Sequence, residues 1–267
     1  MLRQPAVAGS FYPAERQKLE IELKRCLAPS PQKKQAIGIV SPHAGYHYSG
    51  TVAGQVYSQI ELPQKMIILS PNHTGYGLPA SIWPEGEWET PLGKAPVDVS
   101  LSLQWMKNCP LLQKDTAAHI AEHSLEVQIP FLQSLKRQFT FVPVTLSHLR
   151  YSDCHEIGRA LAQTIQGTGK PVLIIASSDM NHYENQEITH KKDLEAIEKI
   201  LALDPQGLYE TVHKKSISMC GIIPTTVMLV AAKELGARKA ELVQHATSGD
   251  VTHDYKSVVG YAGLIIS

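Results

Sequence analysis

Four side chains that could bind a metal ion or transfer a proton each stand a few residues beyond a short apolar segment: His43, His73, Asp179 and His182. Apolar segments of this length that are rich in β-branched residues are typical of buried strands in parallel sheets. Open α/β sheets bind their ligands at the carboxyl ends of the strands. We therefore expect these four side chains to meet in one cleft at that edge of the sheet.

A metal ion would explain such a cluster, because two histidines with one anionic ligand form a common open site for Fe, Cu or Zn. The sequence offers two candidates for the anion, Asp179 and Cys220. Cys220 precedes a predicted helix that begins near Pro224, and a helix N-terminus lowers the pKa of a nearby thiol. A buried, unreactive thiol is also a frequent role of cysteine, so the spacing alone leaves the choice of anion open.

A second pattern of potential ligands, H-x-x-E-H, is formed by His119, Glu122 and His123. On a helix its two histidines would lie on one face, as in the inverzincin metalloproteases. The pattern is short and stands at the start of a predicted helix, so we favour the strand-end site over this one. The motifs of nucleotide-binding loops (Walker A, G-x-G-x-x-G) and of serine hydrolases (G-x-S-x-G) do not occur.

The elements that must position these residues alternate between strands and helices. The predicted strands are 36–40, 66–69, 139–146, 171–176, 240–244 and 258–266, and the predicted helices are 15–27, 124–139, 154–165, 188–203 and 225–235. This order predicts a single α/β domain over residues 1–267, with a mostly parallel central sheet flanked by helices. The segment 76–96 has no clear period, and we interpret it as a lid with Trp83 and Trp88 at its mouth.

The composition indicates a globular protein of the cytoplasm. Hydrophobic residues make up 43% and charged residues 19% of the chain, and 25 basic residues balance 25 acidic ones, which disfavours nucleic-acid binding. The four cysteines form no CxxC pair, as in proteins of reducing compartments. We expect no signal peptide and no membrane-spanning segment, since the longest apolar stretch, 221–232, is too short to cross a bilayer.

A series of motifs, read in order along nearly the whole chain, resembles the Memo family. The motifs are RQPAVAGSFYPAE, SPHAGYHYSG, SPNHTG, WETPLG, AEHSLEVQIPFLQ, ASSDMNHY, MCGIIPT and TSGDV followed by VVGYAG. The resemblance implies a fold similar to the class III extradiol dioxygenases of the LigB type. Those enzymes hold non-haem Fe(II) with two histidines and a glutamate.

In the Memo family the corresponding ligands are His, His and Cys, which implies metal ligation by His43, His73 and Cys220. The resemblance also implies that three catalytic side chains lie beside the metal: Asp179, His182 and His123. His182 is the first candidate for the acid/base. A thiolate in place of the carboxylate favours Cu(I) or Zn over Fe(II). The choice among the metals stays open, and we expect Fe, Cu or Zn.

Three functional hypotheses follow from this site. The leading one is a metal-binding, dioxygenase-like oxidoreductase that acts on a small molecule in the cleft. The second is a hydrolase that uses a metal-activated water, or Cys220 together with His182 and Asp179. The third is a non-catalytic module that binds a peptide or a partner protein in the same cleft. The family association implies radical-SAM proteins as partners in a pathway.

Overall fold

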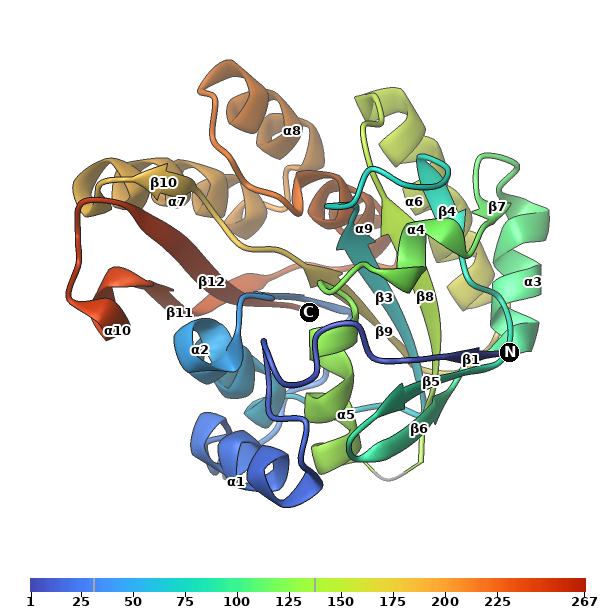
Figure 1. The fold of residues 1–267 in the computed structure, drawn as a ribbon. Coiled ribbons are helices and arrows are strands. Elements are labelled where there is room, and N and C mark those ends of the chain that lie inside the picture. The colour runs from blue at the N-terminus through green and yellow to red at the C-terminus, as the bar shows by residue number, and fades with distance from the viewer. Residues whose placement is uncertain (31, 137) are drawn as a thin grey trace.

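The main sheet has a parallel centre and antiparallel flanks (Figure 1). Its four central strands are β2 (Gly38–Ser41), β9 (Val172–Ser177), β3 (Lys65–Pro71) and β8 (Thr140–Leu146), in that order across the sheet. The flanking strands are β12 (Val258–Ile266), β11 (Ala240–Thr247), β10 (His182–Glu184), β4 (Ala80–Ile82) and β7 (Gln113–Lys114). The computed structural model describes residues 1–30, 32–136 and 138–267.

Alternate residues of the central strands enter two separate hydrophobic cores, one on each face of the sheet. Ile67 and Leu69 of β3 belong to one core, and Met66 and Ile68 belong to the other. This division follows from the two-residue period of a strand, which points successive side chains to opposite faces. Helices must therefore cover both faces, as the near-continuous apolar strands predict.

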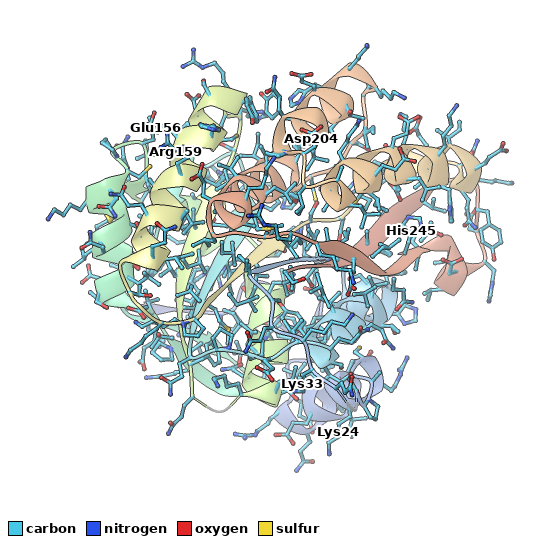
Figure 2. The ribbon with its side chains drawn as sticks, turned by 180° about the vertical axis from the view of Figure 1, so that it is seen from behind. Lys24, Lys33, Glu156, Arg159, Asp204 and His245 are labelled. Atoms are coloured by element: carbon cyan, nitrogen blue, oxygen red, sulfur yellow. The ribbon has the colours of Figure 1, made fainter. Side chains whose placement is uncertain are left out.

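One face is covered by α9 (Ile222–Glu234), which packs on the central strands and is itself packed against other helices. The helices of this side are α3 (Val99–Asn108), α6 (Tyr151–Gln166), α7 (Gln186–Leu201) and α8 (Pro205–Lys214). Figure 2 views the molecule from behind and labels two exposed side chains of α6, Glu156 and Arg159. The opposite face carries α1 (Arg16–Cys26), α2 (Tyr46–Ser58) and α5 (Ile129–Leu135).

Glycine allows α2 to lie against the end of α1. A Cβ atom at Gly54 would stand 2.1 Å from the Cys26 carbonyl oxygen, so no larger residue fits there without a backbone shift. Glycine inside a helix lowers its intrinsic stability, which is why the sequence pattern did not predict α2. Packing against the sheet and α1 stabilises this helix instead. The helices α3 and α8 were also not predicted from the sequence.

The segment 76–96 does not form a lid, and that interpretation is wrong. It contributes β4 to the main sheet, and its strands β5 (Glu87–Thr90) and β6 (Gly93–Pro96) form a small sheet with β1 (Leu2–Arg3). The Trp83 and Trp88 side chains are only 4% and 1% exposed. They pack in the core because their large apolar rings gain more from burial than from lining an open mouth.

The six predicted strands are all present, with bounds that differ by a few residues from the prediction. The predicted helix 124–139 is divided into a 3-10 turn, Glu126–Gln128, and the shorter α5, which has a proline in its first turn; position 137 of that prediction lies outside the described residues. The remaining short helices are α4 (Ala117–Ile120) and α10 (Gly249–Thr252). No helix in the described ranges has both the length and the apolar character needed to cross a membrane.

Candidate metal centre

His43 lies between the end of β2 and the start of α2, and it is held in place by contacts from the last residue of β9 and from the segment that follows it. Its backbone N–H donates to Asp179 Oδ1 at 2.7 Å, and its Nδ1 lies 2.9 Å from Ser177 Oγ. The His43 side chain is buried. Because β2 and β9 are adjacent and parallel, the residues that follow them meet at the same edge of the sheet.

The hydrogen bonds of Ser177 determine which nitrogen of His43 carries a proton. The Ser177 hydroxyl donates its one proton to the Ser124 carbonyl oxygen at 2.6 Å, and it accepts a bond from Gln128 Nε2 at 2.9 Å. With its proton engaged, Ser177 can only accept from His43 Nδ1. Nδ1 of His43 is therefore protonated, and Nε2 keeps the lone pair that could bind a metal ion.

A buried carboxylate fixes His73 in the same way. Glu122 accepts the His73 backbone N–H at 2.6 Å through Oε2 and the Nδ1–H at 2.9 Å through Oε1. Burial alone would raise the pKa of the Glu122 carboxyl, but the bonds from His73 and Ser124 lower it to about 2. This ionised carboxylate raises the pKa of His73 against the effect of burial. It also leaves His73 Nε2 as the nitrogen available for a ligand.

His123 completes a group of three imidazoles. Its ring centroid lies 4.6 Å from that of His73 and 5.5 Å from that of His43, and the His43 and His73 centroids are 5.1 Å apart. One ligating nitrogen from each residue can be chosen such that all three lie within 4.8 Å of one another. The sequence analysis assigned His123 to acid/base catalysis, but its position is also that of a potential ligand.

Burial and mutual repulsion keep His43 and His123 neutral. Burial lowers the pKa of His43 well below its ordinary value, and charge on His73, His123 or His182 would lower it further. Burial also lowers the pKa of His123, to about 4. Neutral imidazole is the form that binds a metal ion, so His43 and His123 are ready to act as ligands at neutral pH.

Cys220 reaches the site from the segment before α9. Its Sγ lies 3.1 Å from His43 Nε2 and accepts the Asp179 backbone N–H at 3.3 Å. Gly221 permits this approach, since a Cβ atom there would stand 2.3 Å from the Ser178 Cβ. Burial, and then the nearby Asp179, raise the pKa of the thiol well above its ordinary value. The expected lowering of the thiol pKa is wrong, because desolvation of the buried thiolate is the largest contribution and raises it.

Asp179 and His182 lie at the same edge of the sheet with different surroundings. The Asp179 carboxyl is buried and 3.9 Å from His43 Nε2 through Oδ2, and burial raises its pKa. His182 is partly exposed, and its Nδ1 lies 2.8 Å from the Ser218 carbonyl oxygen. That oxygen can only accept, so Nδ1 carries a proton and Nε2 points away from this bond.

The H-x-x-E-H pattern does not form a helical metal site. Helix α4 ends at Ile120, so His119 and His123 do not share a helix face. His119 is fully buried in edge contact with the Trp83 and Trp88 rings, and its Nδ1 lies 3.1 Å from Thr145 Oγ1. Burial lowers the pKa of His119 to about 3. Its role is packing, which agrees with our preference for the strand-end site.

We expect the variant His119→Ala to bind metal with the affinity of the original protein. Removing a buried ring leaves a cavity, so the free energy of unfolding should fall by roughly 2–5 kcal/mol. Isothermal titration with Co²⁺ and a thermal unfolding curve measure the two effects. His123→Ala is the matched comparison and should weaken metal binding. A loss of affinity in folded His119→Ala would restore the metalloprotease hypothesis.

Three groups that shape the site were not identified from the sequence as parts of it: Ser177, Gln128 and the Glu122 carboxylate as partner of His73. Ser177 and Gln128 have no spacing typical of ligands, although both stand inside motifs of the Memo resemblance, ASSDMNHY and AEHSLEVQIPFLQ. Glu122 did have a signal, because it belongs to the H-x-x-E-H pattern. A carboxylate next to a histidine motif is a common partner of a ligating imidazole, and this could have directed attention to it.

Comparisons with known proteins identify the family of the chain and a related fold. The family described as "Memo-like protein" matches residues 3–265. The chain is 43% identical to a "MEMO1 family protein" of Methanosarcina mazei and 40% identical to one of Methanopyrus kandleri, with 99% of both chains covered in each case. An uncharacterized protein from Escherichia coli K12 has a related fold, with a TM-score of 0.58 at 14% identity over 86% of this chain and 100% of that one. Given this coverage and identity, the chain belongs to the Memo family.

Proposed function

We propose that this protein binds one transition-metal ion through His43, His73 and Cys220 and uses it in dioxygenase-like oxidoreductase chemistry. The observation that carries the proposal is the fixed tautomer of the two histidines. In each, Nδ1 donates to a protein oxygen, Ser177 Oγ or Glu122 Oε1, so that Nε2 is the available ligand. Histidines held in this way are typical of metal sites.

The donor set fits a metal ion that accepts soft ligands. Cys220 Sγ lies 3.1 Å from His43 Nε2, close enough for both atoms to contact one ion, whereas the group whose ligating atoms all lie within 4.8 Å of one another is His43, His73 and His123. Without a cation, the raised pKa keeps the proton on the thiol. A metal ion would take the place of that proton and stabilise the thiolate. Imidazole with thiolate suits Cu, Zn or Fe.

The remaining side chains would bind and deprotonate a substrate. A metal ion in this position would supply a Lewis acid and, if redox-active, an exchange of electrons with a bound small molecule. His182 Nε2 would accept a proton from that molecule, with Nδ1 held by Ser218. His123, neutral at pH 7, would serve as a second base or as a further ligand. The His73 side chain is 33% exposed, which leaves an approach from solvent on that side.

A thiol-dependent hydrolase has less support. The thiol of Cys220 pairs with His43, not with His182, and burial raises its pKa. A nucleophilic cysteine instead needs a lowered pKa or a base that is free to act. A metal-dependent hydrolase and a module that binds peptides or partner proteins, radical-SAM proteins among them, remain the alternatives to oxidoreductase chemistry.

Elemental analysis of protein purified without added metal is the first test, and we expect about one ion of Fe, Cu or Zn per chain. Oxygen consumption with catechols or ascorbate should then depend on that ion. Metal-dependent cleavage of esters or amides, with no oxygen consumption, would replace the proposal with a hydrolase. Stoichiometric metal binding with neither activity would leave a binding module. Absence of binding to Co²⁺, Zn²⁺, Fe²⁺ and Cu⁺ would refute the metal site itself.

A further inference from the structure

Arg3 is a buried guanidinium close to the turn that carries two residues of the metal centre. Its side chain is 2% exposed and belongs to β1, which pairs with β5. The guanidinium carbon lies 4.1 Å from the centroid of the Trp88 ring. Arginine rarely lies this deep in a protein without specific partners, so its contacts indicate what it is for.

Those partners are backbone carbonyls at both ends of the turn. Arg3 Nε donates to the His119 carbonyl oxygen at 2.8 Å, and Nη2 donates to the Glu122 carbonyl oxygen at 2.7 Å. Both bonds come from one edge of the planar guanidinium, which fixes the distance and the direction between the two carbonyls. The two bonds thereby tie together both ends of the segment from His119 to Glu122.

A buried carboxylate balances the charge and attaches the N-terminal segment to the same place. Glu126 Oε2 lies 2.7 Å from Arg3 Nη1, and Tyr12 Oη donates to Glu126 Oε1 at 2.6 Å. The backbone N–H groups of Ala6 and Val7 also donate to this carboxylate. Four donors thus converge on Glu126, and all come from the first twelve residues of the chain.

The attached segment also contacts the metal centre directly. The Phe11 ring centroid lies 4.6 Å from that of His123. The N-terminal segment therefore contacts His123 through Phe11, while Arg3 holds the backbone at Glu122. Arg3 and Phe11 are not ligands themselves. Any influence of either residue on metal binding must therefore pass through the orientation of Glu122 and His123.

We propose that Arg3 is a positioning residue of the metal centre: its planar guanidinium sets the turn at Glu122, and through the Glu122 carboxylate it sets the orientation of His73. This inference rests on the proposed metal site. Lysine could keep the charge beside Glu126, but a single ammonium cannot donate along one edge to both carbonyls. The substitution Arg3→Lys therefore separates the geometric role of Arg3 from its charge.

Titration with Co²⁺, followed by its visible absorption, tests the inference on the full chain. We expect folded Arg3→Lys to bind Co²⁺ about tenfold more weakly, at the lower end of the effect of removing an outer-shell partner of a metal ligand. Amide hydrogen exchange should become faster in residues 119–123. The control is Arg16→Lys, which changes an exposed ion pair with Glu20 and should alter neither measurement.

The outcomes separate this inference from the metal site itself. If the unsubstituted protein binds no Co²⁺, the proposed function fails. If it binds Co²⁺ and folded Arg3→Lys binds equally well, Arg3 only stabilises the fold and the inference is overturned. Should Arg3→Lys not fold, the double variant Arg3→Gln/Glu126→Gln removes both buried charges together, and the same titration applies. Unchanged affinity in that variant would also overturn the inference.

Discussion

The variant His43→Asn should lose metal affinity by more than about 100-fold, beyond the usual effect of changing an outer-shell partner. An asparagine amide can occupy the place of His43 Nδ1 and donate to Ser177, so that bond is preserved, while the contact of Cys220 Sγ with Nε2 is lost. The backbone N–H to Asp179 is unaffected by the change. Only the Nε2 ligand is removed. Competitive titration with a chelator of known affinity measures the loss.

A matched control is available four residues along the chain. His47 is an exposed histidine of α2, and His47→Asn removes an imidazole without touching the three-histidine group. Its metal affinity should equal that of the unsubstituted protein. If His43→Asn folds normally and binds the ion as tightly as the control, His43 is not a ligand, and the strand-end site must be abandoned.

The second large effect is expected for Cys220→Ser, in both the affinity and its dependence on pH. Because the thiol keeps its proton at neutral pH, binding a metal ion must release that proton. At pH values below the thiol pKa, each increase of one pH unit should therefore raise the metal affinity about tenfold, in addition to any contribution from His73. A serine hydroxyl is a poor anionic ligand. The Cys220→Ser variant should bind the metal ion more weakly, and the slope of its logarithmic affinity against pH should be smaller by one proton.

Absorption and a second cysteine provide the controls for this prediction. Bound Co²⁺ should show a thiolate charge-transfer band that disappears in Cys220→Ser. Cys154 is fully buried in α6, and Cys154→Ser should lower stability while leaving affinity and pH slope unchanged. Equal affinity and an equal slope in folded Cys220→Ser would mean that the thiol is not a ligand. Asp179, 3.9 Å from His43 Nε2, would then be the better candidate for the anion.

The strands that position the site could be predicted because a buried parallel strand needs apolar side chains on both faces. The runs at 36–40, 66–69 and 171–176 correspond to β2, β3 and β9, which are neighbours in the sheet. Residues that follow them must lie at one edge, and His43 and His73 are in fact in contact there. This part of the site needed no information beyond the apolar pattern and the histidine positions.

The neighbourhood of Glu122 could not be predicted in the same way. The letters H-x-x-E-H fit a helical metal site as well as they fit the turn that is observed. The turn is stabilised by Arg3, which is more than a hundred residues away in the sequence, and by the two tryptophans that contact His119. A local pattern contains no information about such partners, so the helix and the turn are equivalent until the chain is folded.

The sequence by itself determined the layered α/β fold and the delivery of His43 and His73 to one edge of the sheet, because both follow from local apolar periods. Only the tertiary structure decided how these residues are held and charged. The proton on His43 Nδ1 depends on Ser177, 134 residues away, whose own proton is taken by Ser124. The raised pKa of the Cys220 thiol likewise depends on burial by distant segments, which a local sequence pattern does not contain.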